Sequence, residues 1–458
     1  MQELDKIKKI HFIGIGGIGI SSVAKLMKWK GKEISGSDSI ESEITKMLKD
    51  EGIKISLSQC KENVPQNADL VVYSVAVADD NIERIVAKEY GIAEITYPQL
   101  LSMLIANKYG IGISGTNGKT TVTAMLSKIL IENNFDPTVV IGSKADFLSG
   151  NARLGESQYL IFESDEYRNA FKNYNPRIAV NTYIGADHFD FYKDEEAISQ
   201  AFNEYFVKVP SDGYLIINAD DPLSLKASKG CSAKIITYGI DNEADYKAEK
   251  ITTTEGKQNF EVYKQSVGIK TSLIVPGKFN VYNSLAAIAA ASTVGIEMNK
   301  IVASLENFKG VWRRFELLGE MNGKTVVSDY AHTPDAIEKT IRAAKEFFPE
   351  KRILVVFQPH QYSRTKKLFS QFSESFTQAD KLIIPDIFYV EGRERPEDFD
   401  IDSNKLVKEI AERGVDSLYG GTLEQTNKEI KKCINDFDII LMMGAGDIYN
   451  LSKQLIQK

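Results

Sequence analysis

The residues best suited to chemistry lie in one stretch, 109–121, where a short apolar run breaks into a glycine loop. The loop reads Gly115-Thr116-Asn117-Gly118-Lys119-Thr120-Thr121. A strand, a glycine loop and a helix start in this order bind phosphate. The glycines let backbone N–H groups approach the anion, and the helix dipole adds roughly half a positive charge. We expect Lys119 to reach the terminal phosphates and Thr120 to offer its hydroxyl to Mg²⁺.

The spacing departs from a complete Walker loop, because Ile113 stands where the first glycine would be. A tight strand-to-helix turn with an incidental lysine is therefore the alternative interpretation. The helical spacing of Val122, Met125, Leu126 and Ile129 directly after the loop favours the phosphate site.

A second glycine motif lies near the start of the chain. A predicted strand at 9–15 runs into Gly14-Ile15-Gly16-Gly17-Ile18-Gly19, and Ser37-Asp38 follows about 20 positions later. Such a turn binds a pyrophosphate and the acidic residue a ribose, as in NAD-binding folds. The pyrophosphate of any nucleotide needs the same turn, and a turn with only a structural role is a further alternative interpretation.

Two apolar runs in the middle of the chain end in residues that can bind metal ions. The run 158–163 ends in Glu163-Ser164-Asp165-Glu166, and the run 178–184 is followed by Asp187-His188. Ligands of open α/β sheets bind outside the carboxyl ends of parallel strands, so Lys119, Thr120, Glu163 and His188 could converge around Mg²⁺ and phosphate. A helix cap or solvated loop for the acidic residues, and ordinary packing for His188, are the alternatives.

The last third repeats this pattern of polar residues after short apolar runs. Predicted strands at 325–328, 353–357 and 438–443 run into polar segments at 329–334, 358–364 and 444–447. Arg313 and Arg314 either clamp an anion or form a surface pair. Asn280 and Asn283 either face a base or cap a helix.

Length and composition fit an α/β protein of roughly three domains. We place the boundaries at 1–107, 108–310 and 311–458, each with a mainly parallel sheet. The net charge of −7 argues against broad binding to nucleic acid. The three cysteines are scattered, no apolar run approaches the length of a membrane span, and the N-terminus lacks a signal-peptide pattern. These features predict a cytoplasmic protein with no membrane partner, either a monomer or a homodimer.

Across essentially its whole length the chain resembles the Mur ligases, the ATP-dependent ligases of peptidoglycan precursor synthesis. The motifs that carry the resemblance are Gly115–Thr121, Glu163–Glu166, Asp187-His188, Asn218–Pro222, Asn280 with Asn283, Arg313–Phe315, Asp329–Pro334 and Gly444–Asp447. Within the family, segments 12–21 and 357–365 are most similar to the ligases that join L-alanine to UDP-N-acetylmuramate.

The resemblance implies a role for each domain. A Rossmann-like first domain would bind UDP through Gly14, Gly16, Gly17, Ile18, Gly19, Ser37, Asp38 and Ser74. A P-loop-type central domain would bind ATP through Gly115, Thr116, Asn117, Gly118, Lys119, Thr120, Thr121 and Asn283, with Arg314 and Asp329 added from a Rossmann-like third domain. Thr120, Glu163 and His188 would hold Mg²⁺, and Tyr330, His332 and Arg364 would bind the amino acid. The implied catalytic residues are Lys119, His188, Arg314 and His332.

The implied chemistry transfers the γ-phosphoryl group to a carboxylate, and the amine of alanine then displaces phosphate from the acyl phosphate. Positive charge at the site stabilises the developing anions. His332 is a candidate acceptor for the amine proton, with packing or alanine binding as equal alternatives. We also expect the domains to close over the substrates.

Two departures from the family pattern bear on the amino acid. Gln361 replaces an arginine that would pair with the alanine carboxylate, and Phe279 replaces a histidine. Residues 329–335 also resemble the ligases that add the third amino acid, although the Asp-Asn-Pro-Arg motif of that branch is absent. A recycling ligase that attaches a preformed peptide, an NAD-dependent oxidoreductase and a nonenzymatic nucleotide switch are the alternative functions.

Overall fold

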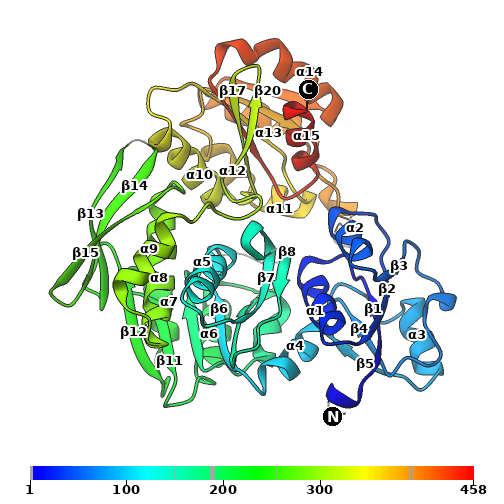
Figure 1. The fold of residues 1–458 in the computed structure, drawn as a ribbon. Helices are drawn as coiled ribbons and strands as arrows, with labels where there is room; N and C mark the ends of the chain where they lie inside the picture. Colours follow the sequence, from blue (N-terminus) through cyan, green and yellow to red (C-terminus); the bar gives the residue numbers. More distant parts are fainter. Residues whose placement is uncertain are drawn as a thin grey trace. The chain divides into compact units, whose positions relative to one another are not determined.

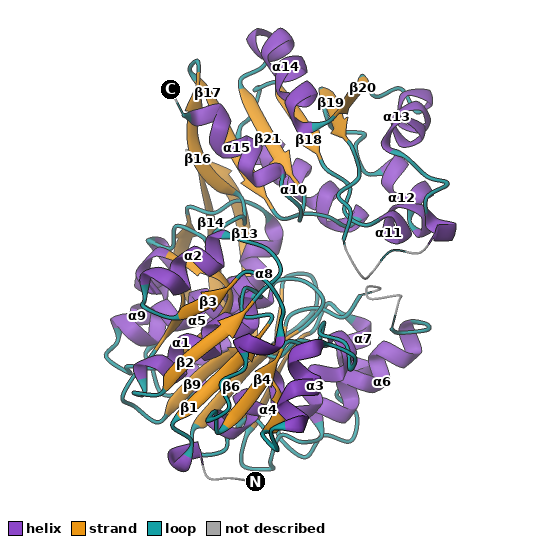
Figure 2. Cartoon of the chain, turned by 90° about the vertical axis from the view of Figure 1, so that its right-hand side faces the viewer, coloured by secondary structure: helices purple, strands orange, loops and turns teal. Residues whose placement is uncertain are grey.

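The computed structural model describes residues 4–148, 150–185, 191–254, 256–390, 394 and 396–457. The chain forms two compact units. The first contains residues 1–249, 261–271 and 282–306, and the second contains 250–260, 272–281 and 307–458. Both are α/β, with helices beside mainly parallel sheets (Figure 1, Figure 2).

The chain begins with a five-stranded parallel sheet of order β3-β2-β1-β4-β5. Its strands are β1 Lys9–Ile13, β2 Glu33–Ser37, β3 Lys54–Ser56, β4 Leu70–Tyr73 and β5 Ala93–Thr96, and its helices are α1 Ile18–Trp29, α2 Glu43–Asp50, α3 Ile82–Glu89 and α4 Tyr97–Ile105. The strand order reverses between β1 and β4, which is where nucleotides bind to doubly wound sheets. The glycine turn at 14–19 follows β1, and Ser74 follows β4, so both lie at this point.

A ten-stranded sheet follows, of order β15-β14-β13-β12-β11-β10-β6-β9-β7-β8. Its strands are β6 Tyr109–Ser114, β7 Thr138–Ala145, β8 Gly150–Arg153, β9 Tyr159–Glu163, β10 Ile178–Asn181, β11 Tyr214–Asn218, β12 Lys234–Gly239, β13 Tyr246–Thr254, β14 Lys257–Lys264 and β15 Val267–Leu273. Its helices are α5 Lys119–Glu132, α6 Glu195–Phe206, α7 Pro222–Ala227, α8 Lys278–Thr293 and α9 Met298–Glu306. The central strand β6 pairs in parallel with β9 and β10, so the three strands deliver their C-terminal residues to one edge.

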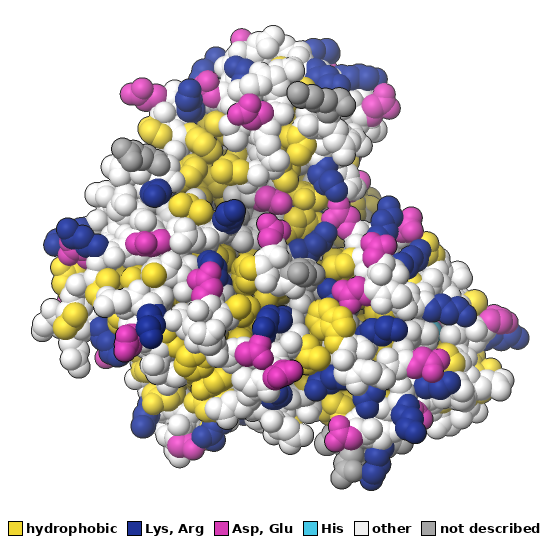
Figure 3. Space-filling view, viewed as in Figure 1, with side chains coloured by type: hydrophobic (Ala, Val, Ile, Leu, Met, Phe, Trp, Pro, Cys, Tyr) yellow, Lys and Arg dark blue, Asp and Glu magenta, His cyan; other side chains and the backbone are white. Residues whose placement is uncertain are grey.

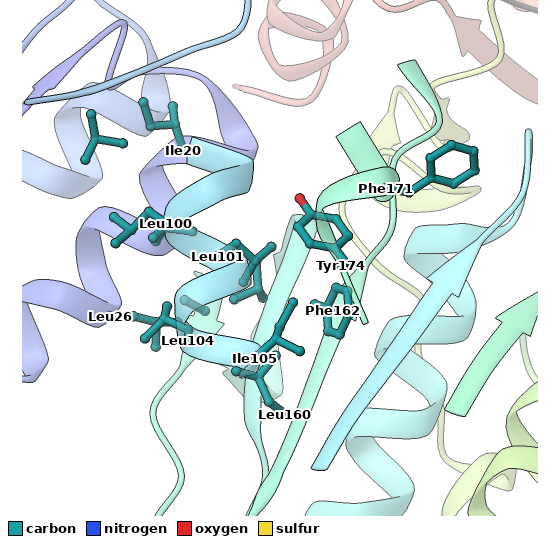
Figure 4. Packing of buried hydrophobic residues seen from close by; sticks show 14 of the residues in the cluster. Ile20, Leu26, Leu100, Leu101, Leu104, Ile105, Leu160, Phe162, Phe171 and Tyr174 are labelled. Carbon is teal, nitrogen blue, oxygen red and sulfur yellow. The ribbon is translucent and has the colours of Figure 1, made fainter. Parts of the chain in front are cut away.

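One hydrophobic core joins these two sheets. Helix α1 packs against β7 and β8, and α4 packs against α1. Figure 4 shows side chains of α4, among them Leu104 and Ile105, between Leu26 of α1 and Leu160 of β9. The two glycine motifs therefore belong to a single compact unit.

The second unit contains a six-stranded sheet of order β16-β17-β21-β18-β19-β20, in which only the β16–β17 pair is antiparallel. Its strands are β16 Glu316–Met321, β17 Lys324–Asp329, β18 Ile353–Phe357, β19 Lys381–Pro385, β20 Ser417–Gly421 and β21 Ile439–Met443. Its helices are α10 Pro334–Phe347, α11 Tyr362–Lys367, α12 Phe369–Glu374, α13 Ser403–Glu412, α14 Leu423–Cys433 and α15 Ile448–Ile456.

Two predicted elements differ at their ends, each for a local reason. The strand expected at 178–184 ends at Asn181, because Thr182 turns to bond the phosphate loop through Ser114 O and Asn117 O. The helix expected from Ser284 begins at Lys278, where Asn280 donates to Pro276 O and Gly277 O. Among the described residues, no helix combines the length and apolar composition that crossing a membrane requires.

Candidate active site

The phosphate loop has the geometry that its sequence predicts. Strand β6 ends at Ser114, and α5 begins at Lys119 after Gly118, which has a φ of +88°. A side chain at Gly115 (φ +128°) would place its Cβ 2.9 Å from the backbone of Tyr183, and one at Gly118 would lie 2.5 Å from Asn283 Oδ1. Glycine is required at both positions because the chain is folded tightly against these neighbours.

Lys119 forms an ion pair with a buried carboxylate. Its Nζ donates to Glu166 Oε2 at 2.7 Å and to Gly115 O at 2.6 Å, and the Glu166 side chain is fully buried. Burial alone would lower the pKa of Lys119, but the charges of Glu166 and Asp165 outweigh it and raise the pKa. Lys119 therefore stays a cation at the start of α5, as phosphate binding requires.

Two of the three predicted metal ligands lie together. Thr120 Oγ1 donates to Glu163 Oε2 at 3.1 Å, and the other carboxylate oxygen of Glu163 accepts from Gly142 N at 2.5 Å. A hydroxyl and a carboxylate beside a phosphate loop fit Mg²⁺, which prefers oxygen ligands shared with substrate phosphates. His188 lies outside the described residues. Within the described ranges, no group of three or more His, Cys, Asp or Glu side chains is arranged for a metal ion.

The glycine turn after β1 is held by the acidic residue predicted to accompany it. Asp38 Oδ2 accepts from Gly16 N at 2.8 Å, and Gly17 N donates to Gly14 O. Ser74 lies against the turn, since a Cβ at Gly14 would be 3.2 Å from the Ser74 Cβ. Ser37, which is predicted to bind UDP, is fully buried, and its hydroxyl donates to Glu83. Its side chain is therefore part of the hydrogen-bonded interior next to the glycine turn.

The rest of the turn contacts its surroundings through backbone atoms and small side chains. Ile18 O accepts from Asn151 Nδ2 at 2.9 Å, which ties α1 to β8. A Cβ at Gly19 would lie 3.2 Å from the Tyr97 ring. The predicted UDP residues thus gather at the carboxyl ends of β1, β2 and β4.

The second unit presents its own polar cluster at the ends of β17 and β18. His332 Nδ1 bonds Tyr330 O at 2.8 Å, and its ring lies 6.2 Å from that of His360. Arg364 NH1 lies 3.2 Å from His360 Nδ1. With Nδ1 of His332 donating to a carbonyl, Nε2 is the basic nitrogen of the neutral ring. The three predicted amino-acid residues are therefore together, and His360 joins them.

The two arginines before Phe315 both lie beside the Tyr330 ring, each with its guanidinium carbon 4.9 Å from the ring centre, but they differ in burial and in hydrogen bonding. Arg313 is buried and its NH2 donates to Gly444 O and to Gly446 O, so it fixes the loop after β21. Arg314 is half-buried, with its guanidinium carbon 4.9 Å from the centre of the Tyr330 ring. Of the pair, Arg313 is engaged by backbone carbonyls, and Arg314 stays the predicted anion-binding residue.

Asp329 is buried at the end of β17. Its carboxylate accepts from Phe315 N at 2.8 Å and Ala331 N at 2.7 Å, and burial raises the pKa of this carboxyl. Asp329 thus holds the turn on which Arg314 and Tyr330 lie.

Glu166, His360 and Thr182 contact predicted site residues but were not assigned to the candidate site. Glu166 follows β9 and His360 follows β18, so position after a parallel strand was the available signal. Thr182 offers no comparable pattern. Asn283 lies in the second turn of α8 and close to the phosphate loop, since a Cβ at Gly118 would be 2.5 Å from its Oδ1.

Family models match three consecutive parts of the chain. They are the Mur ligase family catalytic domain over residues 9–109, the Mur ligase middle domain over 113–291 and the Mur ligase glutamate ligase domain over 313–446. The predicted α/β class with a three-domain architecture is confirmed.

Named relatives are similar to this chain over their full length. UDP-N-acetylmuramate–L-alanine ligase of Caldanaerobacter subterraneus subsp. tengcongensis is 41% identical over 460 residues, which cover 100% of this chain and 99% of the relative. The protein of the same name from Clostridium botulinum strain Okra is 42% identical over 455 residues, covering 99% of this chain and 98% of the relative.

Solved structures show the same fold. The UDP-N-acetylmuramate–alanine ligase of Thermotoga maritima matches with a TM-score of 0.85 and 28% identity, covering 98% of each chain. A murein peptide ligase from Psychrobacter arcticus matches with a TM-score of 0.75 and 26% identity, also over 98% of each chain. The chain belongs to the Mur ligase family.

Proposed function

We propose that this chain is the ATP-dependent ligase that forms an amide between the lactyl carboxylate of UDP-N-acetylmuramate and L-alanine, in peptidoglycan precursor synthesis. The observation that carries the proposal is the loop at the end of β6, where Lys119, Thr120 and Glu163 gather around a helix start. The full-length similarity to ligases of that name supports the choice of substrates.

The proposed reaction proceeds in two steps. A carboxylate oxygen of the sugar nucleotide attacks the γ-phosphorus of ATP, so that ADP leaves and an acyl phosphate forms. The neutral amine of alanine then attacks the acyl carbon, and inorganic phosphate leaves after the amine has lost a proton. Lys119 and Arg314 would stabilise the negative charge on the transferred group. His332, through Nε2, would accept the proton.

Mg²⁺ would be held by Thr120, Glu163 and His188, and would neutralise charge on the phosphates. The amino acid would bind beside Tyr330, His332 and Arg364, and UDP beside Gly14–Gly19, Ser37, Asp38 and Ser74. We further propose domain boundaries near 107 and 310, a cytoplasmic location, and a monomer or homodimer that needs no partner macromolecule.

The test is phosphate release measured with a panel of amino acids. Release that requires both UDP-N-acetylmuramate and L-alanine supports the proposal, and the product should gain the mass of one alanine residue. Glycine and L-serine test the pocket around Gln361, which is buried and carries no charge to pair with the amino-acid carboxylate. The absence of phosphate release with every amino acid tested would contradict the proposed function.

A murein peptide ligase is the second candidate, because one such enzyme shares the fold over 98% of this chain. It would use a preformed peptide in place of alanine. Competition between L-alanine and a tripeptide in the same assay separates the two, since only a peptide pocket admits the longer substrate.

A further inference from the structure

Residues 163–169 contact both the phosphate loop and the segment that follows β4 in the first unit. At one end, Glu163 accepts from Thr120, and Glu166 pairs with Lys119. At the other end, Arg168 NH1 donates to Val75 O at 2.8 Å. Through these hydrogen bonds and this ion pair, the segment connects the phosphate loop with the turn after β4.

The backbone of this segment is strained where it presents Arg168. Arg168 has φ 50° and ψ 32°, and Asn169 has φ 57° and ψ 28°. Two successive left-handed residues that are not glycine are strained, and such strain concentrates at functional sites.

Several contacts impose this conformation. Asn169 N donates to Glu166 O at 3.0 Å, and Phe171 N donates to Asp165 O at 2.9 Å. Tyr192 OH donates to Glu166 O at 2.6 Å. The turn is thus fixed from inside, while the side chain of Arg168 is exposed.

The guanidinium contacts the segment after β4, which itself lies against the glycine turn after β1. Val75 follows Ser74, and Ser74 lies against Gly14. Among the described residues, no carboxylate pairs with Arg168, whereas Glu163 and Glu166 of the same segment are engaged by the phosphate loop. A carbonyl orients a guanidinium without neutralising it, so most of its five N–H donors remain suited to an anion.

We propose that Arg168 is a substrate-binding residue that holds an anionic group of the sugar nucleotide, either the pyrophosphate or the carboxylate. Arg168 lies two residues after Glu166, whose carboxylate pairs with Lys119, and so would couple binding of the sugar nucleotide to the site of phosphoryl transfer. The inference rests on the proposed function and names one further residue for it.

The experiment measures binding and kinetics for Arg168→Ala and Arg168→Gln, with Arg177→Ala as the matched control. Arg177 is a partly exposed arginine of the same unit that pairs with Asp212. Calorimetric titrations use UDP-N-acetylmuramate and UDP-N-acetylglucosamine, which lacks the carboxylate. Thermal unfolding of each variant establishes that it folds, and Arg168→Gln keeps the length of the side chain should alanine unfold the turn.

The expected result is a loss of affinity for UDP-N-acetylmuramate of about 10- to 100-fold, the range for a hydrogen bond between charged groups. The KM for ATP and the behaviour of Arg177→Ala should stay at wild-type values. A parallel loss for UDP-N-acetylglucosamine assigns Arg168 to the pyrophosphate, and unchanged affinity for it assigns the carboxylate.

Wild-type affinity of a folded Arg168→Gln for both UDP sugars would overturn the inference while leaving the ligase proposal intact. A wild-type chain that binds neither UDP sugar would overturn both.

Discussion

At the scale of single residues, the phosphate-loop lysine is held by a partner of opposite charge. Glu166 has no access to solvent, and its Oε2 lies 2.7 Å from Lys119 Nζ. A buried pair of this kind costs desolvation on both sides, so its loss on one side leaves an uncompensated charge. The pair orients Lys119 toward the loop before any nucleotide is present.

Lys119→Met should abolish phosphate release and reduce the free energy of unfolding by roughly 3–5 kcal/mol, because the buried Glu166 carboxylate loses the lysine with which it pairs. The double variant Lys119→Met with Glu166→Gln should recover stability but not activity. Chemical denaturation and the phosphate assay measure the two quantities. Equal stability of the single and double variants would show that the pair does not contribute as described.

Glu83 is a buried carboxylate whose ionised form is stabilised by neighbouring hydrogen-bond donors. It accepts from Asn63 Nδ2 at 2.6 Å, from Ser37 Oγ and from His11 Nε2 at 3.4 Å. Burial alone would raise the pKa of Glu83, but the hydrogen bonds from His11, Ser37 and Asn63 outweigh it and lower the pKa.

A lowered pKa makes Glu83 stabilising above the ordinary value of 4.5, and this stabilisation is lost as pH falls through the pKa of the folded state. Glu83→Gln should therefore destabilise the protein by about 1–3 kcal/mol at pH 7, and the difference from wild type should shrink in acid. Urea unfolding at several pH values measures this. The exposed Glu89→Gln on the same helix is the control, and a pH-independent difference would contradict the explanation.

At the scale of elements, the β6–α5 connection depends on two glycines that no other residue can replace. Gly115 has a positive φ, and backbone atoms of Tyr183 occupy the space into which a side chain at this position would project. Helix α5 starts at Lys119 only because the chain can turn this tightly.

Gly115→Ala should weaken ATP binding at least tenfold and lower the melting temperature, since the new Cβ would collide with Thr182 Oγ1 as well as Tyr183. Gly31→Ala is a matched control, because Gly31 also has a positive φ (+79°) but no atom within 4 Å of the added Cβ. Its cost should be the conformational term alone, about 1 kcal/mol, with normal ATP binding. Calorimetry with ATP and thermal unfolding compare the two, and similar ATP affinities would refute the role of the close contacts.

At the scale of the whole molecule, the residues with proposed roles are divided between the two compact units. Lys119 and Thr120 belong to the first, whereas Arg314, Asp329 and His332 belong to the second. The chain passes between the units several times, at 249/250, 260/261, 271/272, 281/282 and 306/307. On the face shown in Figure 3, acidic and basic side chains are interspersed, so substrate anions must be met by local groups.

The proposed reaction assigns roles to residues of both units, so we expect binding of an ATP analogue together with UDP-N-acetylmuramate to close the molecule. The expected outcome is a smaller radius of gyration in solution scattering with both ligands than with either alone. Lys119→Met serves as the control, since it should remove the response to the ATP analogue. An unchanged radius with all ligands would argue against closure.

Much of this protein was predictable from the order of residues along the chain. The apolar runs at 70–73, 214–218 and 353–357 are strands with the expected bounds, because buried parallel strands leave unbroken apolar signatures. The phosphate loop could be predicted because glycine spacing, lysine and the following helix are all local features. His188 remains a predicted ligand outside the described residues.

Only the tertiary structure decided which distant side chains meet. The sequence could not show that Glu166 would pair with Lys119, that Ser37 would donate a hydrogen bond to Glu83, or that Arg168 would donate one to Val75 O. Each of these contacts joins residues whose separation along the chain is 46 or more, and it depends on how strands are ordered in a sheet and how a turn is strained. Local residue patterns encode strands, loops and helix starts, whereas pairing between elements is set by packing the whole core.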